Sequence, residues 1–175
     1  MTFGVKCKMF IIELEPVFNN DAASKSFDYN LDLSACAYNG GFPFEKPVRV
    51  SGQVKNSTGI VTLTAKADFT LGLICDRCAE PISRQFSVPI EHTLVTELNN
   101  DNSDDFIVVD DLHFDIDPLI TEDIDLFLPT KILCKQDCAG LCPKCGKNLN
   151  NGPCGCKKET DPRWDALSLF TDEDT

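Results

Sequence analysis

Eight of the ten cysteines in this 175-residue chain lie in two groups, and their thiols are the side chains best suited to chemistry. One group is Cys75 and Cys78, and the other is Cys134, Cys138, Cys142, Cys145, Cys154 and Cys156. Clustered thiols in a reducing compartment are usually metal ligands or redox centres. We interpret all eight as metal ligands, because bare clusters of thiols invite oxidation. Cys7 and Cys36 stand alone, and we expect both to be small buried hydrophobes.

The spacing of the last four cysteines is typical of structural zinc. Residues 142–146 read CPKCG, a knuckle with two thiolates separated by two residues and a glycine that can take a positive φ. Cys154 and Cys156 can supply the other two of the four soft ligands that zinc prefers. A second ion could be held by the remaining four, which are Cys75, Cys78, Cys134 and Cys138. We therefore predict one or two Zn²⁺ ions per chain, while the spacing leaves open which four cysteines share an ion.

Iron is the alternative metal. A knuckle of this kind also suits a single-iron site, and the spacing of Cys138, Cys142 and Cys145 matches that of radical enzymes that hold a cluster. Such enzymes need a large barrel after the motif, and only 30 residues follow Cys145. The radical-enzyme interpretation is therefore discounted, whereas a single-iron site stays open.

A thiol redox protein is the alternative function. Cys75 and Cys78 have the spacing of a redox pair, which would be expected to open a helix whose N-terminus lowers a thiol pKa. The pair is followed instead by Ala79, Glu80 and Pro81 in strand-like surroundings. A metal site or a structural bend is therefore the preferred interpretation.

Residues for other kinds of catalysis are scarce. His92 and His113 are the two side chains that could act as bases at neutral pH. We interpret them as structural or solvated, since His92 falls in a strand-like segment and His113 lies beside acidic residues. The sequence has neither a serine in a nucleophile-elbow pattern nor a glycine-rich phosphate loop. We expect that the protein is not an enzyme.

The segments that must position the cysteines are strands. Alternation of β-branched or aromatic residues with polar ones predicts strands at 48–54, 61–65, 69–74 and 85–90, and further strands are expected near 10–14, 26–33 and 106–109. Short connections between successive strands predict antiparallel pairing. The predicted fold class is α+β: a mainly antiparallel β-sheet, as a meander or small barrel, with one or two short helices and a C-terminal cysteine-rich zinc-knuckle module.

An Asp-Pro pair opens each predicted helix. Asp117 is the expected N-cap of an amphipathic helix that ends before Pro129, and a second pair at 161–162 opens a short C-terminal helix. We therefore divide the chain into two domains. Residues 1–130 form a β-rich domain with an acidic loop and the first helix, and residues 131–175 form a cysteine-rich metal-binding segment with the second helix.

Charge is distributed unevenly along the chain. The formal net charge of −12 argues against a surface that binds nucleic acid throughout. Residues 97–125 contain eleven acids and neither Lys nor Arg. The metal-binding segment carries the basic side chains, and these are the candidate RNA contacts: Lys131, Lys135, Lys144, Lys147, Lys157, Lys158 and Arg163.

The motifs occur in an order that points to a family. Cys75-x-Arg77-Cys78 follows the β-rich half, an acidic middle comes next, and residues 138–156 hold CxGLCPxCGxNLN and CxC before DPRW at 161–164. In this the chain resembles the YceD family, bacterial and plastid proteins associated with accumulation of large-subunit ribosomal RNA. The resemblance implies a role in making or stabilising 23S rRNA and hence the large ribosomal subunit, with no known catalytic activity.

The resemblance and the charge pattern together suggest the partners. We expect contact with ribosomal RNA or the pre-ribosomal large subunit through the basic residues, or with a basic ribosomal protein through the acidic stretch 97–125. No membrane contact is expected, because no apolar run approaches the ~20 residues that cross a bilayer. Neither a secretory nor a transit signal is recognisable. We therefore expect a cytoplasmic, non-enzymatic ribosome biogenesis factor.

Overall fold

The computed structural model describes residues 10–38, 41–97 and 106–156. Their contacts divide the chain into two units. The described part of unit 1 runs from residue 10 to 74 and from 81 to 132, and that of unit 2 comprises residues 75–80 and 133–156. Unit 2 therefore combines a short internal segment with the cysteine-rich C-terminal part, and each unit is described by itself.

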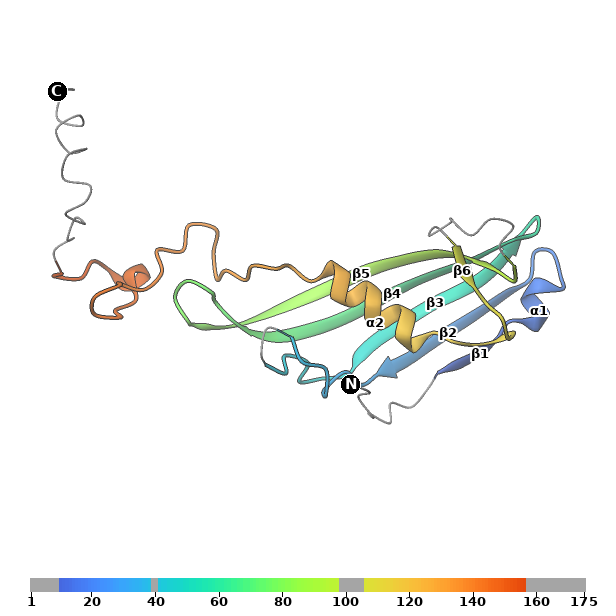
Figure 1. Cartoon of the computed structure of the whole chain (residues 1–175), viewed down its shortest axis with the longest axis horizontal. Helices are drawn as coiled ribbons and strands as arrows, with labels where there is room; N and C mark the ends of the chain where they lie inside the picture. Colours follow the sequence, from blue (N-terminus) through green and yellow to red (C-terminus); the bar gives the residue numbers. More distant parts are fainter. Residues whose placement is uncertain (1–9, 39–40, 98–105, 157–175) are drawn as a thin grey trace, which may run out of the picture. The chain divides into compact units, whose positions relative to one another are not determined.

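Unit 1 is built on a five-stranded sheet with the strands in chain order (Figure 1). The strands are β2 (Ser24–Leu31), β3 (Val48–Ser57), β4 (Ile60–Ile74), β5 (Pro81–Val95) and β6 (Phe106–Val108). The first four pair antiparallel, which confirms the predicted meander. The sheet does not close into a barrel, because β2 and β6 form its edges among the described strands. β6 pairs with β5 in parallel, a feature that the sequence does not predict.

A continuous alternation of buried and exposed residues makes β4 one 15-residue strand. The prediction of two separate runs at 61–65 and 69–74 was wrong in this respect. Ala67 is completely buried and continues the alternation between Lys66 and Asp68, so the pleat carries on without a break. Leu63 and Leu71 are also completely buried on this face.

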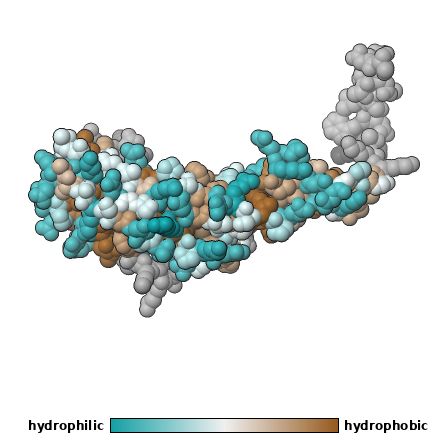
Figure 2. Space-filling view, turned by 180° about the vertical axis from the view of Figure 1, so that it is seen from behind, coloured by the Kyte–Doolittle hydropathy of each residue, from teal (hydrophilic) through white to brown (hydrophobic). Residues whose placement is uncertain are grey.

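One face of the sheet is covered by α2 (Asp117–Phe127), which lies along it in Figure 1 and contacts β5. Ile120 and Ile124 from α2 enter the same buried core as Leu63 and Leu71. Three shorter elements complete unit 1. They are β1 (Ile11–Glu13), which pairs antiparallel with β7 (His113–Asp115), and α1 (Glu15–Phe18), a helix that the sequence does not predict. The view from behind is mostly hydrophilic, with apolar side chains in small areas (Figure 2).

The start of α2 differs from the prediction. Asp117 is its first residue rather than its N-cap, and the side chain of Asp115 accepts the Asp117 N–H at 3.1 Å. The buried Asp117 carboxylate instead accepts from the Tyr29 hydroxyl at 2.7 Å and from the Phe10 N–H at 3.0 Å. Burial, together with the bond to Asp117, raises the pKa of Tyr29 far above its usual range. Asp117 therefore ties three segments together, because burial of its charge requires hydrogen-bond donors.

Gly52 provides a test of the packing between β3 and β4. A Cβ on this residue would lie 2.5 Å from the carbonyl oxygen of Thr64 and 2.8 Å from the Cα of Ala65, both in the backbone of β4. We expect Gly52→Ala to lower the free energy of unfolding by about 1–3 kcal/mol, as overpacking does, measured by urea denaturation. Gly41→Ala is the control, because its nearest atom would be 3.9 Å away. Equal stability of the two variants would contradict this account of the strand contact.

Candidate metal centre

The described cysteines of unit 2 form two groups of four. Cluster A comprises Cys75, Cys78, Cys134 and Cys138, and cluster B comprises Cys142, Cys145, Cys154 and Cys156. Within each cluster all four sulfur atoms lie within 4.8 Å of one another. In cluster A the Cys75 and Cys138 sulfurs are 3.8 Å apart, and those of Cys78 and Cys134 are 3.6 Å apart. Four sulfurs bound tetrahedrally at about 2.3 Å from zinc would be about 3.8 Å apart. The donor set and its spacing therefore fit a tetrahedral metal ion.

The 75–80 turn supplies the first pair of cluster A. The Cys75 N–H donates to the Glu80 carbonyl at 2.9 Å, and the Ala79 N–H donates to the Cys75 carbonyl at 2.9 Å. Ala79 has a φ of 58°, in the region that lets a chain reverse tightly. Cys75 and Cys78 thus lie in the bend that the sequence predicts between two strands. They do not open a helix, so the structural feature expected of a redox pair is missing from this segment.

Cluster A is largely shielded from water. Cys75, Cys78 and Cys138 are each less than 5 % exposed and pack with Leu133 and Cys134 in a small core of their own.

The thiols of cluster A have shifted pKa values. Burial raises the pKa of Cys75, but hydrogen bonds from the N–H groups of Cys134, Cys78 and Arg77 outweigh this effect and bring the pKa to about 6. Burial also raises the pKa of Cys134, to about 12, with Cys138 and Cys78 beside it. Without a cation, the cluster would therefore not hold four thiolates at neutral pH.

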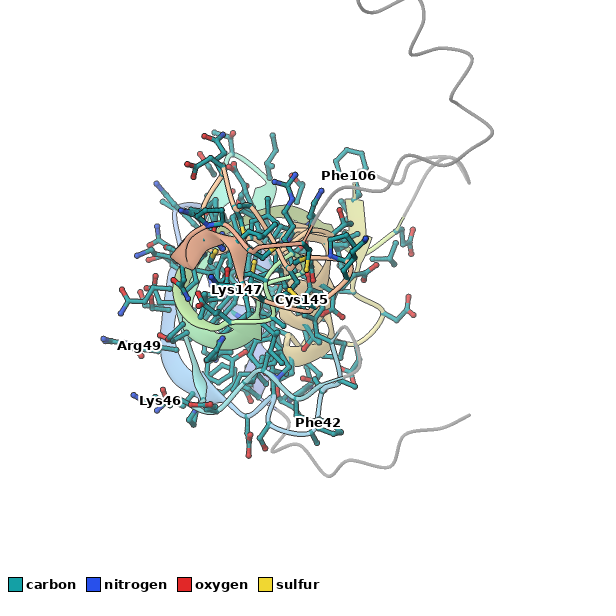
Figure 3. The ribbon with its side chains drawn as sticks, turned by 90° about the vertical axis from the view of Figure 1, so that its left-hand side faces the viewer. Phe42, Lys46, Arg49, Phe106, Cys145 and Lys147 are labelled. Carbon is teal, nitrogen blue, oxygen red and sulfur yellow. The ribbon has the colours of Figure 1, made fainter. Side chains whose placement is uncertain are left out.

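Cluster B has the knuckle geometry that CPKCG predicts. The Gly146 N–H donates to the Cys142 carbonyl at 2.9 Å, and Gly146 has a φ of 70°. The N–H groups of Cys145 and Lys144 lower the pKa of Cys142 to about 6. Cys145 and Cys156 are exposed, in contrast to the four cysteines of cluster A. Figure 3 labels Cys145 and Lys147, two exposed residues of unit 2.

Arg77 and Gly140 brace cluster A. The guanidinium of Arg77 donates to the Cys138 carbonyl at 3.0 Å, and the Arg77 carbonyl accepts the Leu141 N–H at 3.0 Å. Gly140 lies against this contact with a φ of 74°, and a Cβ there would approach the Arg77 carbonyl oxygen to 3.1 Å. Both residues belong to the motifs noted in the sequence, but the motifs alone do not indicate what Arg77 and Gly140 do. In the structure, both residues hold the second pair of cluster A against the 75–80 turn.

If cluster A holds zinc, for which its four sulfurs are suited, Gly140→Ala is expected to weaken zinc retention. The positive φ costs an L-residue about 1–2 kcal/mol, and the close approach to Arg77 adds to this. We expect the variant to lose zinc to a competing chelator at least about 10-fold more readily than the wild type, given that 1.4 kcal/mol is a factor of ten. The matched control is Gly155→Ala, where a Cβ would meet no atom within 4 Å. If both variants retain zinc equally, Gly140 does not brace the cluster.

The two histidines lie outside both clusters. His92 Nε2 is 2.7 Å from the Asp123 carboxylate, which links β5 to α2. His113 lies beside Asp111, at 3.2 Å, and Glu13, at 3.6 Å. The described residues therefore place these imidazoles in ion-pairing positions within unit 1.

The predicted RNA contacts are divided between the units. Lys131 is exposed in unit 1, and Lys135, Lys144 and Lys147 are exposed in unit 2. The Lys147 ammonium donates to the Pro153 carbonyl at 3.0 Å, which joins the segment after the 142–146 knuckle to the segment before Cys154. Lys157, Lys158 and Arg163 lie outside the described residues, as do the predicted C-terminal helix, the acidic residues 98–105 and Cys7. Cys36 is partly buried against the core of unit 1.

The family model described as "Large ribosomal RNA subunit accumulation protein YceD" matches residues 63–170, which include both clusters. The chain belongs to the YceD family. The description of the family names accumulation of an RNA and no chemical reaction. This membership agrees with the motif order at 75–78 and 138–164.

Relatives of this YceD chain occur in bacteria and plants. It is 30 % identical to the chloroplastic "Large ribosomal RNA subunit accumulation protein YCED homolog 1" of Arabidopsis thaliana, over 67 % of this chain and 46 % of that protein. It is 30 % identical to an uncharacterized protein of Mycobacterium tuberculosis, over 63 % and 55 % of the two chains. It is 28 % identical to the uncharacterized protein YlbN of Bacillus subtilis, over 86 % and 90 %. No solved structure matches.

The similarity to the plant and mycobacterial proteins is partial, because the match spans about half of their length. None of the described helices is long and apolar enough to span a bilayer.

Proposed function

We propose that this protein is a non-enzymatic ribosome biogenesis factor that supports accumulation of 23S rRNA and assembly of the large subunit, and that clusters A and B each hold one structural zinc ion. Membership of the YceD family is the observation that carries the ribosomal role. The two four-sulfur clusters support the zinc ions. Zinc would supply folding energy and charge neutralisation, because four thiolates in one site repel one another without a cation.

Zinc is preferred to iron on the basis of the ligands. Both clusters are closed sets of four cysteines, the arrangement of structural zinc sites in small modules. The burial of cluster A suits an ion that holds a fold together. A single iron would fit the same sulfurs, and it would give a coloured protein. The absorbance spectrum therefore separates the two metals.

Direct RNA contact is proposed through the exposed lysines, although the metal itself weakens the electrostatic argument. A Zn²⁺ ion with four thiolates has a formal charge of about −2, so two filled sites add negative charge to unit 2. The described part of unit 2 contains four basic side chains and three acidic ones: Arg77, Lys135, Lys144 and Lys147, and Asp76, Glu80 and Asp137. Binding to phosphate would therefore depend on the local position of the lysines rather than on net charge.

Contact with a basic ribosomal protein is the second mode. Asp110, Asp111, Glu122 and Asp125 are exposed, and the stretch 97–125 contains neither Lys nor Arg. Leu126 and Phe127, at the end of α2, are 79 % and 47 % exposed. An acidic surface with apolar side chains beside it could bind a basic, partly apolar partner until RNA replaces it.

The ribosomal role is tested by depleting the protein in its own organism. We expect the ratio of 23S to 16S rRNA to fall, and full-length wild-type protein to restore it. An unchanged ratio would overturn the proposed function.

The mode of contact is tested with purified full-length variants and pre-ribosomal particles. Lys135→Glu with Lys144→Glu should abolish binding if the lysines contact RNA, whereas Asp110→Asn with Asp125→Asn should abolish it if the acidic surface binds a protein. Zinc content is measured for each variant, so that loss of a cluster is not mistaken for loss of a contact. If both pairs bind normally, neither surface makes the contact.

A further inference from the structure

We infer that clusters A and B are coupled through Asn150, a residue of the cluster B loop that positions a ligand of cluster A. The inference rests on the proposal that both clusters hold zinc. Asn150 lies between Cys145 and Cys154, which are both in cluster B. Its Nδ2 is nevertheless 3.2 Å from the sulfur of Cys138, a ligand of cluster A.

The orientation of the Asn150 amide is determined by its partners. The Ala139 N–H can only donate, and it points to Oδ1 of Asn150 at 2.9 Å. Nδ2 therefore carries the two hydrogens, one directed to the Cys138 sulfur and the other to Oδ1 of Asn148 at 2.9 Å. Every hydrogen of the amide group is thus used, and one of them stabilises a thiolate.

The same loop contacts the other end of cluster A. Asn148 Nδ2 donates to the Glu80 carboxylate at 2.8 Å, in the turn that carries Cys75 and Cys78. The Leu149 N–H donates to the Gly140 carbonyl at 2.8 Å, and Asn148 also forms a β-bridge with Leu141. Residues 148–150 therefore contact both the 75–80 turn and the segment around Cys138, while Cys145 and Cys154 lie at the ends of this loop in cluster B.

This arrangement predicts coupled metal binding. Zinc in cluster B holds the loop ends, so the hydrogen bonds from Asn148 and Asn150 to cluster A are formed without a further loss of loop entropy. Outer-shell partners of this kind typically contribute about 10–100-fold in metal affinity. Because coupling is reciprocal, filling cluster A must strengthen cluster B by the same factor.

Asn150→Asp tests the positioning role in the full-length protein. The carboxylate keeps the size of the amide and still accepts from Ala139, but it cannot donate to the Cys138 sulfur and it repels the thiolate. We expect its zinc affinity at cluster A, measured by competition with a chromophoric chelator, to fall about 10–100-fold. With Co²⁺ in place of zinc, the sulfur-to-cobalt charge-transfer band should shift. Asn151→Ala is the matched control, since Asn151 is exposed in the same loop.

The coupling is tested with Cys145→Ser and Cys156→Ser combined, which disables cluster B. Affinity at cluster A should fall, and adding Asn150→Asp should then cost less than it does in the wild type. Unchanged affinity and an unshifted cobalt band in Asn150→Asp would overturn the inference while leaving two zinc ions per wild-type chain. A wild-type protein that binds no zinc would instead overturn the metal proposal, and this inference with it.

Discussion

Cys138→Ser is expected to reduce bound zinc from about two ions per chain to about one. Cys138 is 3 % exposed, and its sulfur lies 3.8 Å from that of Cys75, so the substitution removes a donor from a cluster that is largely shielded from water. A serine hydroxyl is a poor replacement for a soft thiolate. Elemental mass spectrometry on protein purified without a metal-binding tag measures the change.

The loss of this ion should also unfold the surroundings of cluster A. A structural zinc site contributes about 10–16 kcal/mol, whereas Leu133 is the one apolar side chain that packs with the four cysteines of cluster A among the described residues. The control is Cys36→Ala, because Cys36 packs against the core of unit 1. Retention of both ions by Cys138→Ser, or loss of an ion from Cys36→Ala, would contradict the assignment of ligands.

Removing both zinc ions with a strong chelator is expected to unfold unit 2 and leave unit 1 folded. Unit 1 has its own core, in which Leu63, Leu71 and Ile120 are completely buried, and its strands pair with one another. Hydrogen exchange measured by mass spectrometry should show residues 75–80 and 133–156 exchanging at nearly unfolded rates while β4 remains protected.

Zinc addition should restore protection in unit 2, and magnesium, which prefers oxygen ligands, should not. Loss of protection in β4 along with unit 2 would mean that the two units do not fold separately. Persistent protection of unit 2 without metal would mean that the clusters are not its source of stability.

Much of the sheet could be predicted, because the alternation of apolar and polar residues marks the strands and short connections between them allow only antiparallel pairing. The runs at 48–54 and 85–90 lie within β3 and β5, and the antiparallel pairing of each with β4 follows from the length of the turns. The strand predicted near 106–109 is confirmed as β6, whereas its parallel pairing with β5 could not be predicted, since a three-residue strand carries almost no pattern that selects a neighbour. The helix α1 is also short, with four residues, and α2 begins differently because the side chain of Asp117 is bound by tertiary contacts.

The two clusters differ in how well the spacing of cysteines along the chain predicts them. Cys142, Cys145, Cys154 and Cys156 are close in the chain, so spacing alone brings them to one site. Cys75 is about sixty residues from Cys134, and their approach requires the turn after β4 to meet the C-terminal part. From the sequence, Cys75 and Cys78 could be grouped with Cys134 and Cys138 only because these four cysteines remained once the last four were assigned to one site. The role of Asn150 was not visible, because an asparagine in a loop normally suggests a turn.

The most direct test of the central claim is the metal content of the intact protein together with X-ray absorption at the zinc edge. Two zinc ions per chain, each with four sulfur neighbours at about 2.3 Å, are predicted for clusters A and B. Iron in place of zinc, a shell containing nitrogen or oxygen, or metal-free protein with disulfides would contradict the claim that two structural zinc sites hold unit 2 together.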